Sequence, residues 1–205
     1  MPKTRLAARE VVDLAISWLV ISLCFSARGI YNDATRFSTL FASSLIAVGL
    51  GFLLHELMHR TVAKSFACHA EYRMWPLGLL LALALAMVSR GSLIFAAPGA
   101  VYIVPLAYSP YISSEQLRRI YGLIALAGPM ANLVLALVFY LVLGLSLHPF
   151  MDFTAVVGLR VNLWLAAFNL LPIPPLDGVN VVRWSPVIWG SVAIPTWIAT
   201  IFIIT

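Results

Sequence analysis

The chain has 205 residues, of which 62% are hydrophobic and only 10% are charged, and its mean hydropathy is +0.97. A soluble domain carries about 25% charged residues, so this composition excludes a water-soluble globular protein and indicates a surface that meets lipid. The formal net charge of +5 comes without a basic run, which argues against a nucleic-acid partner. Cys24 and Cys68 share no framework spacing, so neither a disulfide scaffold nor a cysteine-based zinc site is predicted.

Five apolar segments are candidates for membrane spans, because a helix needs about 20 mostly apolar residues to cross the hydrocarbon core. The first follows a basic, signal-like N-terminus, but no small-residue cleavage site comes after it, so we predict a retained span. The third carries no charged residue. The predicted spans are residues 11–27, 40–62, 120–147, 153–171 and 187–204.

The segment of about residues 70–107 is predicted to lie at the membrane interface. Its apolar run 77–88 has 12 residues, too short to span at about 1.5 Å per residue. Residues 92–107 are rich in β-branched and aromatic side chains around Pro98-Gly99, a pattern typical of a β-hairpin. We therefore expect an all-α polytopic membrane protein with about five transmembrane helices, a short interfacial helix and a small interfacial β-hairpin. Residues 1–205 form a single domain in this prediction.

The distribution of Lys and Arg predicts the orientation in the membrane. With the N-terminus inside, only Arg28, Arg36 and Arg160 lie outside or near the outer ends of the spans. The cytoplasmic residues are Lys3, Arg5, Arg9, Arg60, Lys64, Arg73, Arg90, Arg118, Arg119 and Arg183. The second and fourth spans then both run towards the cytoplasm, so His59 and Asp177 near their ends fall at similar depth. The side chains of Trp184, Trp189 and Trp197 are interpreted as interface anchors or as lipid-facing bulk.

The second span ends in the sequence HELMH, which places His55 and His59 four residues apart. Residues at this spacing share one helix face, so the two imidazoles can bind one metal ion, and Glu56 on the flank can hydrogen-bond a water at that ion. Ionisable side chains at membrane depth cost at least about 2.5–3.5 kcal/mol, which favours a function. The alternative is a helix that has left the membrane, with solvated His and Glu side chains; Arg60 and Lys64 support that alternative.

Residues 169–178 read NLLPIPPLDG. Three prolines in four positions cannot continue a helix, and a break at membrane depth is tolerated where the chain lines a cavity. Asp177-Gly178 is a turn that can direct a carboxylate towards its neighbours. Without the HELMH sequence, this segment agrees at least as well with a helix that ends at the cytoplasmic boundary, with a solvated Asp177, as with a metal ligand.

Together, these two segments predict a catalytic zinc site. His55, His59 and Asp177 give zinc three protein ligands and leave the fourth position for water. Glu56 then takes the proton of that water and passes it to the leaving amine. The reaction is peptide hydrolysis without a covalent intermediate.

Three motifs carry a resemblance to a known family. HELMH at 55–59, AGPMANL at 127–133 and NLLPIPPLDG at 169–178 resemble, in this order, the motifs of the site-2 protease family of intramembrane zinc metalloproteases. The resemblance covers about residues 40–180, with core spans at about 40–62, 120–147 and 153–171. It implies Zn²⁺ ligation by His55, His59 and Asp177, with Glu56 as base.

The same resemblance implies that Asn132 and Asn169 bind substrate or order the site. It also implies cleavage of a transmembrane protein substrate in or near its membrane-spanning segment. We expect a prokaryotic cell membrane, and the Lys and Arg distribution places the N-terminus and the active site towards the cytoplasm. Residues 73–78 and the segment around 98–99 resemble the family's interfacial strands, which pair with an unwound substrate as an added strand.

Other interpretations remain open from the residues alone. Gly128-Pro129 with Asn132 also fits an ordinary packing patch at a helix kink. Buried His, Glu and Asp side chains also suit a transporter that relays protons or ions, although the chain has no internal repeat. A third possibility is an inactive membrane scaffold, against which the intact Glu56 argues. The substrate and the oligomeric state are not determined by the sequence.

Overall fold

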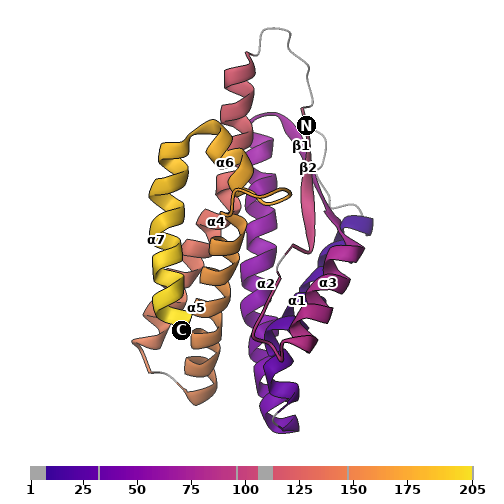
Figure 1. Ribbon diagram of the computed structural model, residues 1–205, viewed down its shortest axis with the longest axis vertical. Helices are drawn as coiled ribbons and strands as arrows, with labels where there is room; N and C mark the ends of the chain where they lie inside the picture. The colour runs from indigo at the N-terminus through magenta and orange to yellow at the C-terminus, as the bar shows by residue number, and fades with distance from the viewer. Residues whose placement is uncertain (1–7, 32, 96, 106–112, 147, 205) are drawn as a thin grey trace.

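The computed structural model describes residues 8–31, 33–95, 97–105, 113–146 and 148–204. Figure 1 shows α2 running through the centre, with α1, α3 and two strands on one side and α4, α5 and α7 on the other. The elements in chain order are α1 (Ala8–Ile30), α2 (Ala34–Ser65), β1 (Cys68–Met74), α3 (Pro76–Val88), β2 (Gly99–Pro105), α4 (Ser114–Leu143), α5 (Pro149–Asn169), α6 (Gly178–Trp184) and α7 (Pro186–Ile204).

Five of the described helices, α1, α2, α4, α5 and α7, are long and apolar enough to cross a membrane. This confirms the predicted all-α polytopic class and the multi-pass character of the chain. The 13-residue α3 is apolar but short, as its sequence predicted. α4 begins earlier than residue 120 because Ser113 and Gln116 form a capping box, and the predicted end at Leu147 lies outside the described residues.

The two strands form a small antiparallel sheet, as predicted, but the predicted pairing was wrong. β2 pairs with β1 over the register Cys68↔Pro105 to Met74↔Gly99, and not with residues 92–97. Pro98-Gly99 is no hairpin turn, because α3 lies between the two strands in the chain. Part of segment 92–97 is held elsewhere: the Leu93 N–H donates to the Ser89 hydroxyl, and the Ile94 carbonyl accepts from the Trp164 indole.

The main core lies where α1, α2, α5 and β1 meet. Its buried side chains include Ile21, Phe52, Tyr72 and Val161. A second cluster packs α4 against α5 around Phe139. One face of α2, which carries His55 and His59, is therefore buried in the protein, whereas Leu57 and Met58 of the HELMH sequence are exposed.

Candidate metal centre

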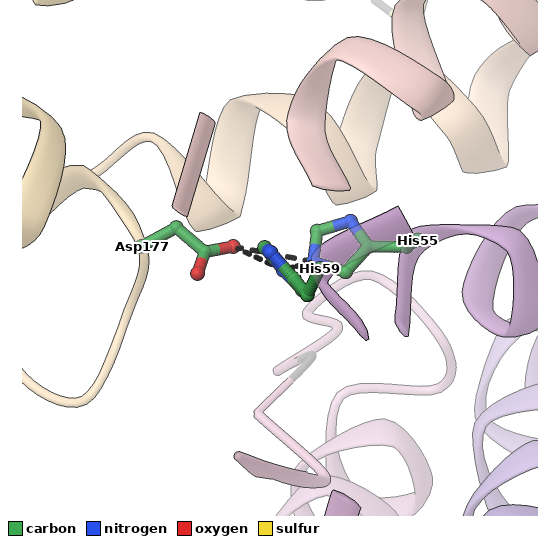
Figure 2. Close-up of side chains that lie close together, drawn as sticks. All are labelled: His55, His59 and Asp177. Carbon is green, nitrogen blue, oxygen red and sulfur yellow. Dashed lines mark hydrogen bonds and ion pairs between the residues drawn. The ribbon is translucent and has the colours of Figure 1, made fainter. Parts of the chain in front are cut away.

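His55 and His59 lie one helical turn apart on α2 and direct their imidazole rings to the same point (Figure 2). Their Nε2 atoms are 3.0 Å apart. Asp177, from the loop between α5 and α6, places its Oδ2 atom 3.2 Å from each of these nitrogens. Both histidines are only 4% exposed, so the alternative of solvated side chains on a helix outside the protein does not describe them.

The proline-rich loop explains how Asp177 reaches the histidines. α5 ends at Asn169, and the three prolines within residues 172–175 lack the N–H groups that would continue it. α6 begins at Gly178, where a Cβ atom would lie 2.3 Å from the Leu170 carbonyl oxygen. Only glycine lets the chain return this closely to the end of α5, and this return directs Asp177 towards α2.

The hydrogen-bond partner of each Nδ1 atom determines which ring nitrogen of the histidine carries the hydrogen. His59 Nδ1 lies 2.7 Å from the Ile124 carbonyl oxygen, which only accepts, so this nitrogen carries the hydrogen. His55 Nδ1 lies 2.6 Å from Asn132 Oδ1. The orientation of that amide is set by its Nδ2, which donates to the Gly51 carbonyl and to Asn162 Oδ1, both at 3.0 Å. His55 is therefore the donor to Asn132.

Both imidazoles consequently present an Nε2 lone pair to the point that Asp177 Oδ2 also faces. Three acceptors at this spacing repel one another, and a cation between them removes the repulsion. Ligand atoms at about 2.0–2.1 Å from a tetrahedral zinc ion are about 3.3 Å apart, close to the separations of 3.0 and 3.2 Å found here. His55, His59 and Asp177 can thus hold a metal ion, and the donor set fits zinc.

Gly128 of α4 leaves room for the two imidazoles. A Cβ atom at this position would lie 2.4 Å from His59 Nε2 and 2.6 Å from His55 Nε2, closer than such atoms can approach. The Gly128-Pro129 pair therefore has a specific consequence: the groups that approach the glycine are the two candidate metal ligands. A general helix-packing patch does not account for this contact.

A cavity of about 90 Å³ opens beside the three ligand atoms, with room for several water molecules. Glu56 and Asn169 both border it. Asn169 Nδ2 donates to the Leu165 carbonyl at 3.0 Å, which fixes the side chain at the cavity wall. The structure thus brings Glu56 and Asn169 to the same space as the three ligands; their catalytic and substrate-binding roles remain predictions.

Asn132 lies behind His55 rather than in the cavity lining, is fully buried and uses both ends of its amide on protein partners. Its predicted substrate-binding role is untested, and its contacts favour an ordering role. Asn162 completes this chain of hydrogen bonds and was missed by the sequence analysis. A polar residue in the apolar span 153–171 was the only available signal.

The edge of β2 that points away from β1 has no strand partner in the described part of the chain, and it lies beside the cavity. Residues opposite one another in an antiparallel pair direct their N–H and C=O groups either at each other or away from each other. The Tyr72 N–H points at α1, where it donates to Glu10 at 3.1 Å, so its partner Val101 points its own groups away from β1. Gly99, Val101 and Ile103 border the cavity, so this row of backbone groups lies beside the candidate metal site.

Glu10 of α1 joins α2, which carries the two candidate histidine ligands, to the sheet. Arg60, directly after His59, forms a 2.7 Å ion pair with Glu10 and is only 8% exposed. Because Arg60 is buried, it no longer supports the alternative of a helix that has left the membrane with solvated side chains. Burial raises the pKa of the Tyr72 phenol, so the hydroxyl stays protonated and donates to Ser17 of α1 at 2.8 Å.

Fold and site together define a polytopic membrane protein in which two histidines and one aspartate, from two separate segments, meet at a cavity between spanning helices. No protein-family model matches the chain, and no solved structure matches it.

Two known proteins are similar to the chain in sequence. A Methanocaldococcus jannaschii protein named "Putative zinc metalloprotease MJ0611" is 44% identical over 194 residues, which cover 93% of this chain and 92% of the relative. The chain therefore belongs to the family of this zinc metalloprotease. A Bacillus subtilis protein named "Putative zinc metalloprotease YwhC" is 28% identical over 149 residues, covering 68% of this chain and 67% of the relative. Both names agree with the zinc that the sequence predicts.

Proposed function

We propose that this chain is an intramembrane zinc endopeptidase of the site-2 protease type, which hydrolyses peptide bonds in or near the transmembrane segments of membrane proteins. The observation that carries the proposal is the convergence of three metal-ligand atoms and Glu56 on one cavity among helices long enough to span a membrane. In this proposal His55, His59 and Asp177 bind the zinc ion. The names of the two relatives support the same class of reaction.

When bound, zinc supplies Lewis-acid polarisation of the scissile carbonyl and makes a water molecule more acidic. Glu56 borders the same cavity, accepts the proton that this water gives up, and delivers it to the leaving amine. Asn132 and the Ile124 carbonyl keep the hydrogens of His55 and His59 on their Nδ1 atoms, so that both Nε2 lone pairs face the metal.

A peptide bond within a substrate helix is shielded by its own hydrogen bonds, so the segment to be cut must first unwind. The free edge of β2 offers an unwound segment a row of backbone partners next to the cavity, by addition of the substrate as a further strand. The excess of Lys and Arg at one set of helix ends supports a cytoplasmic position of this edge and of the N-terminus.

The test is the zinc content and activity of the wild type and Glu56→Gln, both purified in detergent and offered a membrane-spanning model peptide. We expect about one zinc ion per chain in each, with cleavage by the variant at least about 10²-fold slower because the proton acceptor is lost. Absence of zinc from both proteins, under conditions that do not strip metal, would overturn the metal site and favour an ion pathway. Zinc without cleavage by the wild type would favour a scaffold.

A further inference from the structure

Two tryptophans of α7 donate hydrogen bonds to the end of α5, directly before the loop that carries Asp177. The Trp189 indole donates to the Leu170 carbonyl at 2.8 Å, and the Trp197 indole donates to the Ala167 carbonyl at 2.8 Å. The two rings also contact each other edge to face, with centroids 5.6 Å apart. The sequence-based interpretation of Trp189 and Trp197 as simple interface anchors was therefore incomplete.

The helix break deprives both of these carbonyls of their usual partners. In a continued helix the Leu170 carbonyl would accept from residue 174, which is a proline and has no N–H. The Ala167 carbonyl would accept from Leu171, but the Leu171 N–H donates to Phe168 at 3.1 Å instead. A carbonyl without a donor is costly at membrane depth, and the indoles supply the missing hydrogen bonds.

The Leu170 carbonyl is also where the loop returns. Gly178 lies so close to it that a Cβ atom would be 2.3 Å from the carbonyl oxygen. The group that Trp189 binds therefore contacts the first residue after Asp177, so the two ends of the loop meet at this carbonyl. A shift of the Leu170 carbonyl would shift the base of the Asp177 side chain relative to His55 and His59.

We propose that Trp189 and Trp197 are positioning residues for the metal centre, which act through the loop on the coordination geometry of Asp177. This proposal rests on the proposed function in one respect, namely that Asp177 is a zinc ligand. α7 is the least buried of the five candidate spans, with 17% of its apolar window buried. Few of its side chains are enclosed. Its side-chain hydrogen bonds to α5 and the residue after it, among the described residues, come from the two indoles and from the Thr200 hydroxyl, which donates to the Leu163 carbonyl at 3.4 Å.

The test uses Trp189→Phe, Trp197→Phe and the double variant, which keep an aromatic ring but remove the N–H. Trp164→Phe is the matched control, because the Trp164 indole donates to the Ile94 carbonyl at 3.2 Å. Ile94 lies between α3 and β2 and is not part of the loop that carries Asp177. Zinc affinity is measured by chelator competition, and coordination by the visible absorption spectrum of the Co²⁺ form. We expect the double variant to bind zinc about tenfold more weakly or worse, with an altered Co²⁺ spectrum, and the control to match the wild type.

The same double substitution in an Asp177→Asn background separates positioning from general destabilisation. If the indoles act through Asp177, removal of their N–H groups causes no further loss of zinc affinity once the carboxylate ligand is gone. An equal fold-loss in both backgrounds, or wild-type affinity in the double variant, would overturn the inference and leave the proposed function intact. A wild type that binds no zinc would overturn the proposed function, and this inference with it.

Discussion

At the scale of single residues, the two candidate histidine ligands are oriented by different kinds of partner. His59 donates to a main-chain carbonyl of α4, whereas His55 donates to the side chain of Asn132. Since a backbone carbonyl cannot be removed by substitution, the orientation of His55 is the part of the site that a point mutation can test directly.

We expect Asn132→Ala to weaken zinc binding by about 10–100-fold, the usual effect of losing a hydrogen-bond partner of a metal-bound histidine. The variant also leaves the Asn162 side chain without its amide donor. Chelator competition on the purified protein measures the change. Wild-type zinc affinity in this variant would mean that His55 is oriented by packing alone.

Asn169→Ala is the contrasting substitution, because Asn169 borders the cavity and its Nδ2 bonds only to the Leu165 carbonyl among the contacts described. We expect unchanged zinc affinity and a raised KM for a membrane-spanning peptide, with kcat less affected, if Asn169 binds substrate as predicted. An unchanged KM would remove Asn169 from the substrate-binding residues.

At the scale of elements, α1 is attached to α2 and β1 through polar contacts as well as through apolar packing. Glu10 accepts from Arg60 of α2 and from the backbone of β1, and Asp13 accepts from the Met74 N–H at 3.3 Å. These carboxylates accept from the outward N–H groups of Tyr72 and Met74 on β1, whereas the outer edge of β2 has no strand partner among the described residues and lies beside the cavity.

We expect Glu10→Ala to lower the free energy of unfolding by about 3–5 kcal/mol, because it leaves the Arg60 charge buried without a partner. Glu10→Leu combined with Arg60→Leu removes both charges, and much of the stability should return. Thermal unfolding in detergent measures both. The control is Glu71→Ala, which breaks a more exposed 2.8 Å pair with Arg73 and should cost no more than about 1 kcal/mol. Equal losses for Glu10→Ala and Glu71→Ala would contradict the assigned role of Glu10.

At the scale of the whole molecule, the candidate metal site joins α2 to the loop between α5 and α6, two parts of the chain that the cavity otherwise separates. Metal binding to the folded state alone stabilises it, by about 2.7 kcal/mol at a free concentration of 100 Kd. We therefore expect chelation to lower the midpoint of thermal unfolding and added zinc to restore it. Asp177→Asn should lose most of this zinc-dependent shift; a shift as large as that of the wild type would exclude Asp177 as a ligand.

Local patterns predicted the elements well and the contacts between them less well. The apolar segments appear as five long helices, and the proline-rich segment 169–178 is a break between α5 and α6. The resemblance placed an interfacial strand at residues 73–78, whereas β1 spans Cys68–Met74. The residues of β1, CHAEYRM, alternate between buried and more exposed positions at the first five places, which is a strand signal. The β-branched residues near Pro98-Gly99 drew the predicted pairing to the wrong segment, because a hairpin is the shortest way to pair a strand.

The class of protein, the number of candidate spans and the residue types at the candidate metal centre could be predicted before the fold was known, because hydropathy and helical spacing are local properties of the chain. Only the tertiary structure decided that Asn132 orients His55, that Arg60 is buried against Glu10, and that the indoles of α7 bind the end of α5. Each of these contacts joins residues distant in sequence. Their physical cause is the same: a polar group enclosed among apolar helices needs a partner, and packing alone determines which one is within reach.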